Sequence, residues 1–188
     1  MIKGCIQLGQ TPDIHNTVNM VPVDHVARVV VASTLYPPST PLAVAQVTSH
    51  PRLRFNEFLA TLPVYGYNVQ RVDYIPWRIA LERHVTEVSK DNALYPLVHF
   101  VCDNLPQSTK APELDDGNAR RALGKYDEKW VGGSGVDEGL MGVYLSYLVG
   151  VGFLEAPKGE GKGLPDVKIG ERSLKRVKEI GGRGAIVA

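Results

Sequence analysis

The sequence predicts an α/β chain that is rich in helix and contains a few short strands. One observation is the order strand, helix, strand between Arg52 and Ile75, with Gly66 near the end of the helix. A second is the helical spacing of apolar residues from Asn92 onward. A third is the stretch Val26–Ala32, in which every residue except Arg28 is apolar. That stretch predicts a helix buried on most of its circumference.

The residues before this helix are expected to be mostly irregular. Residues 1–8 can form the end of a helix, and residues 9–16 contain the proline and aspartate of a turn-rich loop. Residues 19–23 are predicted to be extended. Asp24 then takes the N-cap position, where its carboxylate can accept backbone N–H groups of the first helical turn.

The middle of the chain alternates between breakers and periodic segments. Residues 36–41 carry three prolines and are expected to be irregular, while residues 42–47 predict a short buried strand. Asn56 is expected to cap the next helix. Residues 69–75 predict a strand, and Pro76 opens the helix that follows. The residues expected to be buried on that helix are Trp77, Leu81, Val85 and Val88.

The second half is predicted to be helical. The first of its helices has a shared apolar face formed by Leu94, Leu97, Val98, Val101 and Leu105. Asp115 or Asp116 is expected to cap a second, short helix. The apolar residues on that short helix are Ala119, Ala122 and Leu123.

The longest helix is expected to begin at Ser134, with Asp137 in the capping-box position. Its predicted buried residues are Leu140, Tyr144, Tyr147, Leu148 and Val151. Residues 156–188 are predicted to be a flexible linker and tail, in which residues 173–180 form a short basic helix.

The composition narrows the class of protein. With 188 residues, 44% hydrophobic and 22% charged, the chain fits one globular domain. A net charge of +1 supplies no electrostatic basis for binding nucleic acid or an acidic membrane. Neither a run of 18 apolar residues nor a signal-peptide stretch is present. The two cysteines are expected to be reduced thiols, so we expect a cytoplasmic protein.

Three long motifs resemble a known family. They are NTVNMVPVDHVARVV at residues 16–30, VTSHPRLRFNEFL at residues 47–59 and KAPELDD at residues 110–116. In the same order, they resemble the C-terminal half of the thioester reductase domain of the fungal L-2-aminoadipate reductases. The resemblance covers residues 3–154.

The resemblance implies a fold and a reaction. Residues 1–155 would be the C-terminal, substrate-side portion of a Rossmann-type extended short-chain dehydrogenase/reductase. The family's reaction is the NADPH-dependent reduction of a carrier-bound L-2-aminoadipyl thioester to the semialdehyde, in lysine biosynthesis. The implied partner is a carrier domain bearing the phosphopantetheine thioester.

Two sequence motifs that such a reductase needs are absent from this sequence. The glycines at 132, 133 and 135 follow no apolar strand, and those at 159, 161 and 163 precede no convincing helix, so neither group matches the dinucleotide-binding turn. None of the eight tyrosines is followed by lysine four residues later, as the catalytic Tyr-x-x-x-Lys pair requires. We therefore expect a chain that is truncated on its N-terminal side and does not catalyse reduction alone.

Other site chemistries have little support. The five histidines have no spacing suited to a metal site, and neither Cys5 nor Cys102 completes one, so no metal is expected. The pair Asp115 and Asp116 can suggest acid/base catalysis, but helix capping explains it better.

The resemblance places one candidate site. In extended short-chain reductases, the segment before the V-P-V-D turn and the loop after it line the substrate pocket. The candidate pocket residues here are Asn16, Asn19, Met20, Val21, Pro22, Val23, Asp24 and His25. Asn19 can bond the acyl or amino end of a substrate. In the alternative interpretation, Asn16 and Asn19 only satisfy turn backbone and Asp24 only caps a helix.

Three functional hypotheses follow from the sequence. The first is a segment of an aminoadipate reductase that contributes substrate pocket and not cofactor site. The second is a non-catalytic remnant or a module that binds a carrier or another partner. The third keeps the reductase fold but changes the acyl thioester.

Overall fold

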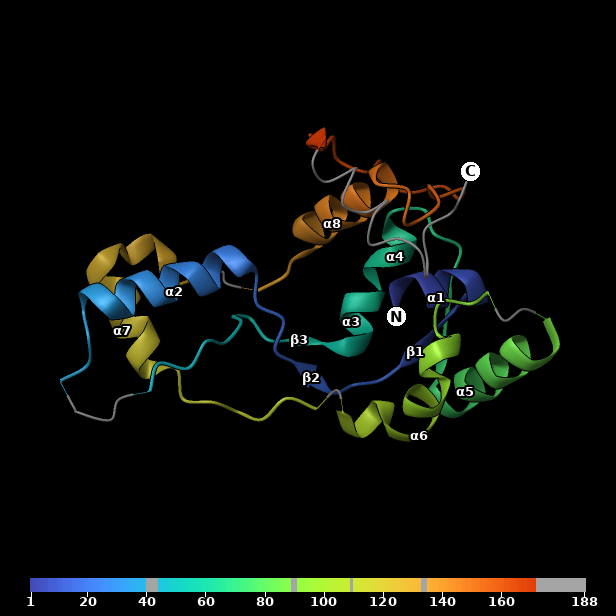
Figure 1. Cartoon of the computed structure of the whole chain (residues 1–188), viewed down its shortest axis with the longest axis horizontal. Coiled ribbons are helices and arrows are strands. Elements are labelled where there is room, and N and C mark those ends of the chain that lie inside the picture. Colours follow the sequence, from blue (N-terminus) through green and yellow to red (C-terminus); the bar gives the residue numbers. More distant parts are fainter. Residues whose placement is uncertain (40–43, 89–90, 109, 133–134, 172–188) are drawn as a thin grey trace. The chain divides into compact units, whose positions relative to one another are not determined.

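The computed structural model of the chain describes residues 1–39, 44–88, 91–108, 110–132 and 135–171. The chain divides into two compact units. Unit 1 comprises Met1–His15, Asn56–Ser108 and Asp137–Ala188, and unit 2 comprises Asn16–Phe55 and Thr109–Val136. The helices and strands are, in chain order, α1 (Ile2–Leu8), β1 (Gln10–Asp13), β2 (Thr17–Val18), α2 (Val23–Leu35), β3 (Leu53–Arg54), α3 (Phe55–Leu59), α4 (Thr61–Val64), β4 (Gln70–Asp73), α5 (Tyr74–Arg83), the π-helix η1 (His84–Val88), the 3₁₀ helix η2 (Tyr95–Leu97), α6 (Val98–Ser108), α7 (Gly117–Tyr126), the 3₁₀ helix η3 (Glu128–Trp130) and α8 (Glu138–Gly150) (Figure 1).

Unit 1 contains a pair of parallel strands, β1 and β4, in which Thr11 lies opposite Arg71 and Pro12 opposite Val72. The prediction of a strand over residues 69–75 is confirmed with shorter bounds. The prediction that residues 9–16 form a loop is wrong for Gln10–Asp13. Pro12 breaks local strand propensity, but it is fully buried, so packing and pairing with a distant strand override the local signal.

Helix α5 follows β4 directly and packs on β1, to which the Trp77 indole N–H donates a hydrogen bond at the Gln10 carbonyl, 3.2 Å away. Pro76 lies in the first turn of α5, as predicted. Trp77, Leu81 and Val85 are buried, also as predicted, but Val88 is 71% exposed. A switch from α-helix to π-helix at His84 changes the angular spacing of the side chains, which takes Val88 off the buried face.

The helical prediction after Asn92 is confirmed, as η2 and α6. Leu94, Val101 and Leu105 are buried, but Leu97 is 53% exposed. Leu97 ends the 3₁₀ turn, which has three residues per turn, so the continuous 3.6-residue spacing assumed from the sequence does not hold there.

The helix predicted from Asn56 is two short helices, α3 and α4, which Gly66 follows with a φ of 82°. Asn56 lies inside α3 and does not cap it. Leu62 is buried in α4, and the Tyr65 hydroxyl just beyond it donates a hydrogen bond to the Glu138 carbonyl of α8.

Helix α8 differs from its prediction in both start and buried face. Asp137 is its N-cap, and the carboxylate accepts a hydrogen bond from the Leu140 N–H at 2.7 Å. The capping-box assignment is therefore wrong, while Ser134 lies outside the described residues. The buried residues are Met141, Gly142 and Leu145, not the predicted set, of which Tyr144 is 38% exposed. Because α8 is apolar almost all round, its sequence carries no strong signal for one buried face.

The chain after α8 makes backbone contacts within unit 1. The Tyr67 hydroxyl donates to the Glu155 carbonyl, and the Gly159 and Lys162 N–H groups donate to the carbonyls of Gly66 and Val64 at 2.8 and 2.7 Å. The boundary that separates residues 1–155 from 156–188 stays a prediction. The basic helix predicted over residues 173–180 lies outside the described residues.

Unit 2 is built from α2 and α7, which pack side by side, and the antiparallel pair β2 and β3 (Figure 1). The core between the helices is formed by Val29, Ala32, Ala119, Ala122 and Leu123. The predicted burial of the three α7 residues is confirmed.

Helix α2 begins at Val23, earlier than predicted, with Pro22 at its N-cap. The prediction that residues 26–32 are buried on most of the helix circumference is wrong, because Val30 and Val31 are 58% and 46% exposed. Of the strand predicted at residues 42–47, the first two residues lie outside the described part, and residues 44–47 have no regular structure.

Candidate functional site

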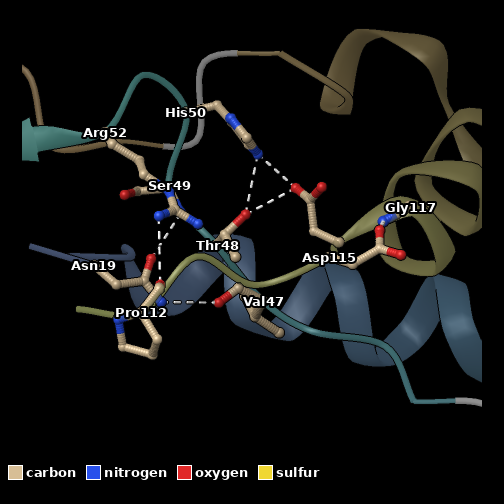
Figure 2. A network of polar contacts seen from close by, with 10 residues as sticks. Asn19, Val47, Thr48, Ser49, His50, Arg52, Pro112, Asp115 and Gly117 are labelled. Atoms are coloured by element: carbon tan, nitrogen blue, oxygen red, sulfur yellow. Dashed lines mark hydrogen bonds and ion pairs between the residues drawn. The ribbon is translucent and has the colours of Figure 1, made fainter. Parts of the chain in front are cut away.

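Asn19 connects the loop after β2 to a distant segment of unit 2. Its side-chain N–H donates a hydrogen bond to the Val47 carbonyl at 3.1 Å, and its side-chain oxygen accepts one from the Ser49 N–H at 2.9 Å (Figure 2). Both ends of the amide are therefore used to hold residues 47–49. An asparagine suits this role because it carries a donor and an acceptor on one short side chain.

Thr48 and His50 belong to the same segment, and both contact Asp116 at the start of α7. The Thr48 hydroxyl donates to Asp116 Oδ2 at 2.8 Å, and His50 Nε2 lies 2.5 Å from the same oxygen. Because an ionised carboxylate only accepts hydrogen bonds, the tautomer that satisfies this contact carries its hydrogen on Nε2. Asp116 therefore anchors two side chains from residues 48–50.

The arrangement does not activate a nucleophile. Thr48 Oγ1 and Asp116 Oδ2 both face the same ring nitrogen of His50, so the imidazole does not lie between hydroxyl and carboxylate. The threonine proton is directed at Asp116 instead. A threonine nucleophile needs a base that accepts its proton, so the geometry favours positioning over covalent catalysis.

Asp116 is held in its charged form. Burial raises the pKa of its carboxyl, but the hydrogen bonds from His50 and Thr48 and the charge of Arg120 outweigh burial, and the pKa falls below its usual 3.8. Only 14% of the Asp116 side chain is exposed. At neutral pH the site therefore has a fixed, largely buried negative charge.

His25 lies in the first turn of α2 and is buried. It shares a cavity of about 10 Å³ with Thr48, His50 and Asp116. This volume is close to the space that one water molecule needs. Burial, followed by the charge of Arg28, lowers the pKa of His25 below 6.5, so its imidazole is neutral at pH 7.

Further bonds join the same three segments of unit 2. The Ala111 N–H donates to the Thr17 carbonyl at 3.0 Å. Arg52 Nη1 donates to the Pro112 carbonyl at 3.3 Å, and Figure 2 shows these two residues. The three motifs that carry the resemblance, at residues 16–30, 47–59 and 110–116, therefore meet in one polar network.

The chain is similar over almost its whole length to fungal enzymes. It is 58% identical over 189 residues to the L-2-aminoadipate reductase of Schizosaccharomyces pombe, a match that covers 98% of the chain. It is 53% identical to the L-2-aminoadipate reductase large subunit of Penicillium chrysogenum, and 50% identical to the L-2-aminoadipate reductase of Saccharomyces cerevisiae, over 98% and 100% of the chain. Over nearly its whole length, the chain matches a segment of the fungal L-2-aminoadipate reductases. It spans 13–14% of the length of these relatives.

One solved structure of a reductase domain also matches the chain. The terminal R domain from the myxalamid PKS-NRPS biosynthetic pathway superposes with a TM-score of 0.64 and 26% identity, covering 83% of this chain and 38% of that one. The chain therefore has an α/β fold that matches part of a reductase domain of the extended short-chain type. No protein-family model matches the chain.

The resemblance to the reductases predicts eight pocket residues, and in the structure these residues have different environments. Asn19 hydrogen-bonds the segment at residues 47–49. His25 lines the same small cavity as the cluster of Thr48, His50 and Asp116. The Asn16 backbone carbonyl accepts a hydrogen bond from the Phe55 N–H, beside the β2–β3 pair. Met20, Val21 and Pro22 are half-buried, and Val23 is exposed. A substrate contact for any of the eight stays a prediction.

Asp24 is not a helix cap. It lies one residue inside α2, where its carboxylate pairs with Arg28 one turn later at 2.8 Å. Pro22 suits the N-cap because its fixed φ leads into the helix, so α2 begins two residues earlier than the aspartate alone suggests.

Sequence reasoning missed His50 and Thr48, and it assigned Asp116 to capping. Asp115 is the residue that behaves partly as predicted, since its carboxylate accepts a hydrogen bond from the Gly117 N–H at 2.9 Å (Figure 2). Asp116 is at the N-cap position without a side-chain capping bond. The signal that could have found the cluster was the resemblance itself, because its second and third motifs contain all three residues.

The described residues do not form a dinucleotide site. β4 leads directly into α5, and Asp73 and Tyr74 at this junction stand where a dinucleotide site has glycines, so a pyrophosphate would meet a negative charge and a bulky side chain. Gly159 and Gly161 lie against the backbone near Gly66. Among the described residues, no group of three or more His, Cys, Asp or Glu is placed to hold a metal, and no helix is long and apolar enough to cross a membrane.

Proposed function

We propose that the chain is the substrate-side segment of a reductase that reduces a carrier-bound L-2-aminoadipyl thioester to the semialdehyde in lysine biosynthesis. The observation that carries the proposal is 58% identity to an L-2-aminoadipate reductase over 98% of the chain. The proposal places the reaction in the cytoplasm and assigns NADPH binding to sequence outside this chain, because its described residues do not fit a dinucleotide.

Within the proposal, the Asn19 network positions the substrate segment. The amide holds residues 47–49, and Asp116 holds Thr48 and His50, so the loop between β2 and α2 is attached to α7 through side chains. Such attachment allows the half-buried Met20 and Val21 to present a fixed surface to an acyl chain. Small displacements of a positioning loop can cost as much as ~100-fold in rate.

The test uses the native protein that carries this chain, purified from its source, with L-2-aminoadipyl thioester on its carrier as substrate. We expect Asn19→Ala to lower kcat/KM by about tenfold or more. The control is Thr34→Ala on the exposed end of α2, where the hydroxyl bonds the Val30 carbonyl in its own helix. An unchanged kcat/KM for Asn19→Ala removes Asn19 from the site.

The alternatives give different results. A native protein that reduces no thioester supports the non-catalytic, partner-binding interpretation. Reduction of another acyl thioester in preference to the aminoadipyl one keeps the reductase assignment and changes the substrate. The mass of the native protein in cell extract, measured with an antibody to residues 136–154, shows whether the rest of a reductase accompanies this chain.

A further inference from the structure

A cavity of about 430 Å³ lies in unit 2 between the end of α2 and one face of α7. Its residues are Tyr36, Pro37, Pro38 and Ser39 on one side and Asn118, Arg121, Ala122 and Lys125 on the other. The volume falls within the usual range for small-molecule sites. The cavity shares no lining residue with the Asn19 network.

The charge of this cavity is positive. Arg121 and Lys125 are four residues apart on α7 and therefore lie on the same helical face. No carboxylate lines the cavity, and within the described part of the chain neither side chain forms an ion pair. Two cations converging on one cavity favour an anionic ligand.

Asn118 orients the arginine. Its side-chain N–H donates to the Val44 carbonyl at 2.9 Å, which leaves its oxygen to accept a hydrogen bond from Arg121 Nη2. This contact engages one edge of a guanidinium group that carries five N–H donors. The planar guanidinium matches two oxygens of a phosphate, and a lysine adds a compact charge.

The remaining walls are apolar or neutral. Tyr36 is 40% exposed, and Pro37, Pro38 and Ala122 add carbon surface, while the Ser39 hydroxyl can donate to an oxygen. A bare inorganic ion would leave this carbon surface unused. The lining fits an anion attached to an organic group.

We infer that this cavity binds the phosphate group of an organic phosphate ester. Arg121 and Lys125 bind the phosphate, and Tyr36, Pro37 and Pro38 contact the organic part. Two sources share this chemistry: the phosphate of a carrier's phosphopantetheine arm, which rests on the proposed function, and a soluble nucleotide. The inference about the phosphate itself does not depend on the source.

The experiment is calorimetric titration of the full chain with two matched pairs of ligands. One pair is phosphopantetheine and pantetheine, and the other is adenosine monophosphate and adenosine. We expect the phosphorylated member of at least one pair to bind about tenfold more tightly than its partner. We expect Arg121→Gln and Lys125→Gln each to remove most of that difference.

The control is Lys129→Gln, which removes a nearby cation that does not line the cavity. It should leave the difference intact, and circular dichroism should show the same fold for all three variants. A preference within one pair identifies the source of the phosphate, and a preference within both shows a site that tolerates either organic group. Equal binding within both pairs, or a preference that survives both cavity variants, overturns the inference. If phosphate binding fails while the native protein still reduces the thioester, only this inference is lost.

Discussion

The carboxylate of Asp116 lies 2.5 Å from Nε2 of His50, although 66 positions separate the two residues in the sequence. The Thr48 hydroxyl reaches the same oxygen, so one aspartate at the start of α7 holds a segment that itself has no regular structure. Side-chain hydrogen bonds, and not backbone pairing between strands, therefore hold the conformation of this irregular segment.

Removing the Asp116 carboxylate should destabilise unit 2. In Asp116→Ala, the buried Thr48 and the half-buried His50 lose their common acceptor, and we expect the free energy of unfolding to fall by roughly 2 kcal/mol. Urea denaturation of the full chain measures it. Asp115→Ala is the control, because Asp115 makes an exposed bond to the Gly117 N–H and should cost less than about 1 kcal/mol. Equal losses in the two variants would contradict an anchoring role for Asp116.

The buried His25 should make stability depend on pH. Its pKa is lowered in the folded chain, so the unfolded chain binds a proton more readily as the pH falls below 6.5. The contribution of His25 is therefore complete above pH 6.5 and is lost as the pH falls through the lowered folded value. Chemical denaturation at pH 7.5 and pH 5.5 should show a loss at the lower pH that His25→Gln reduces. An equal loss in the parent chain and in His25→Gln would contradict this role for His25.

Gly161 should tolerate no side chain. A Cβ there would lie 2.7 Å from the Val64 carbonyl oxygen and closer still to the Gly66 nitrogen. Gly161→Ala should therefore break the Lys162-to-Val64 hydrogen bond and cost about 1–3 kcal/mol.

Gly163 supplies the matched control, because a Cβ there meets nothing within 4 Å. Hydrogen exchange at the Lys162 amide should accelerate in Gly161→Ala and remain unchanged in Gly163→Ala. Similar exchange in both variants would show that the segment after α8 is not held against residues 64–66.

Trp77 should be needed for the packing of α5 on β1. Its side chain is fully buried and its N–H bonds the Gln10 carbonyl, so Trp77→Phe loses both volume and a hydrogen bond. We expect a loss of roughly 2–3 kcal/mol in thermal or urea unfolding. Trp130→Phe changes the same atoms at a half-buried site, where the ring stacks on Tyr126 and lies under Arg28, and should cost clearly less.

Where local signals agreed with the tertiary environment, prediction from sequence succeeded. Pro76 at the start of α5 and Ala119, Ala122 and Leu123 on α7 lie where the pattern placed them. It failed where packing overrode propensity. Pro12 lies in a strand because β4 pairs with it.

The sequence by itself determined the class of fold, most helices and, through three long motifs, the relationship to the aminoadipate reductases. These features depend on local spacing and residue type, which a single chain displays directly. The tertiary structure alone decided that Asn19, His50 and Asp116 belong to one network, and that Arg121 and Lys125 line a cavity with Tyr36. Such contacts join residues far apart in the chain, and the direction of a side chain depends on the packing of every element around it.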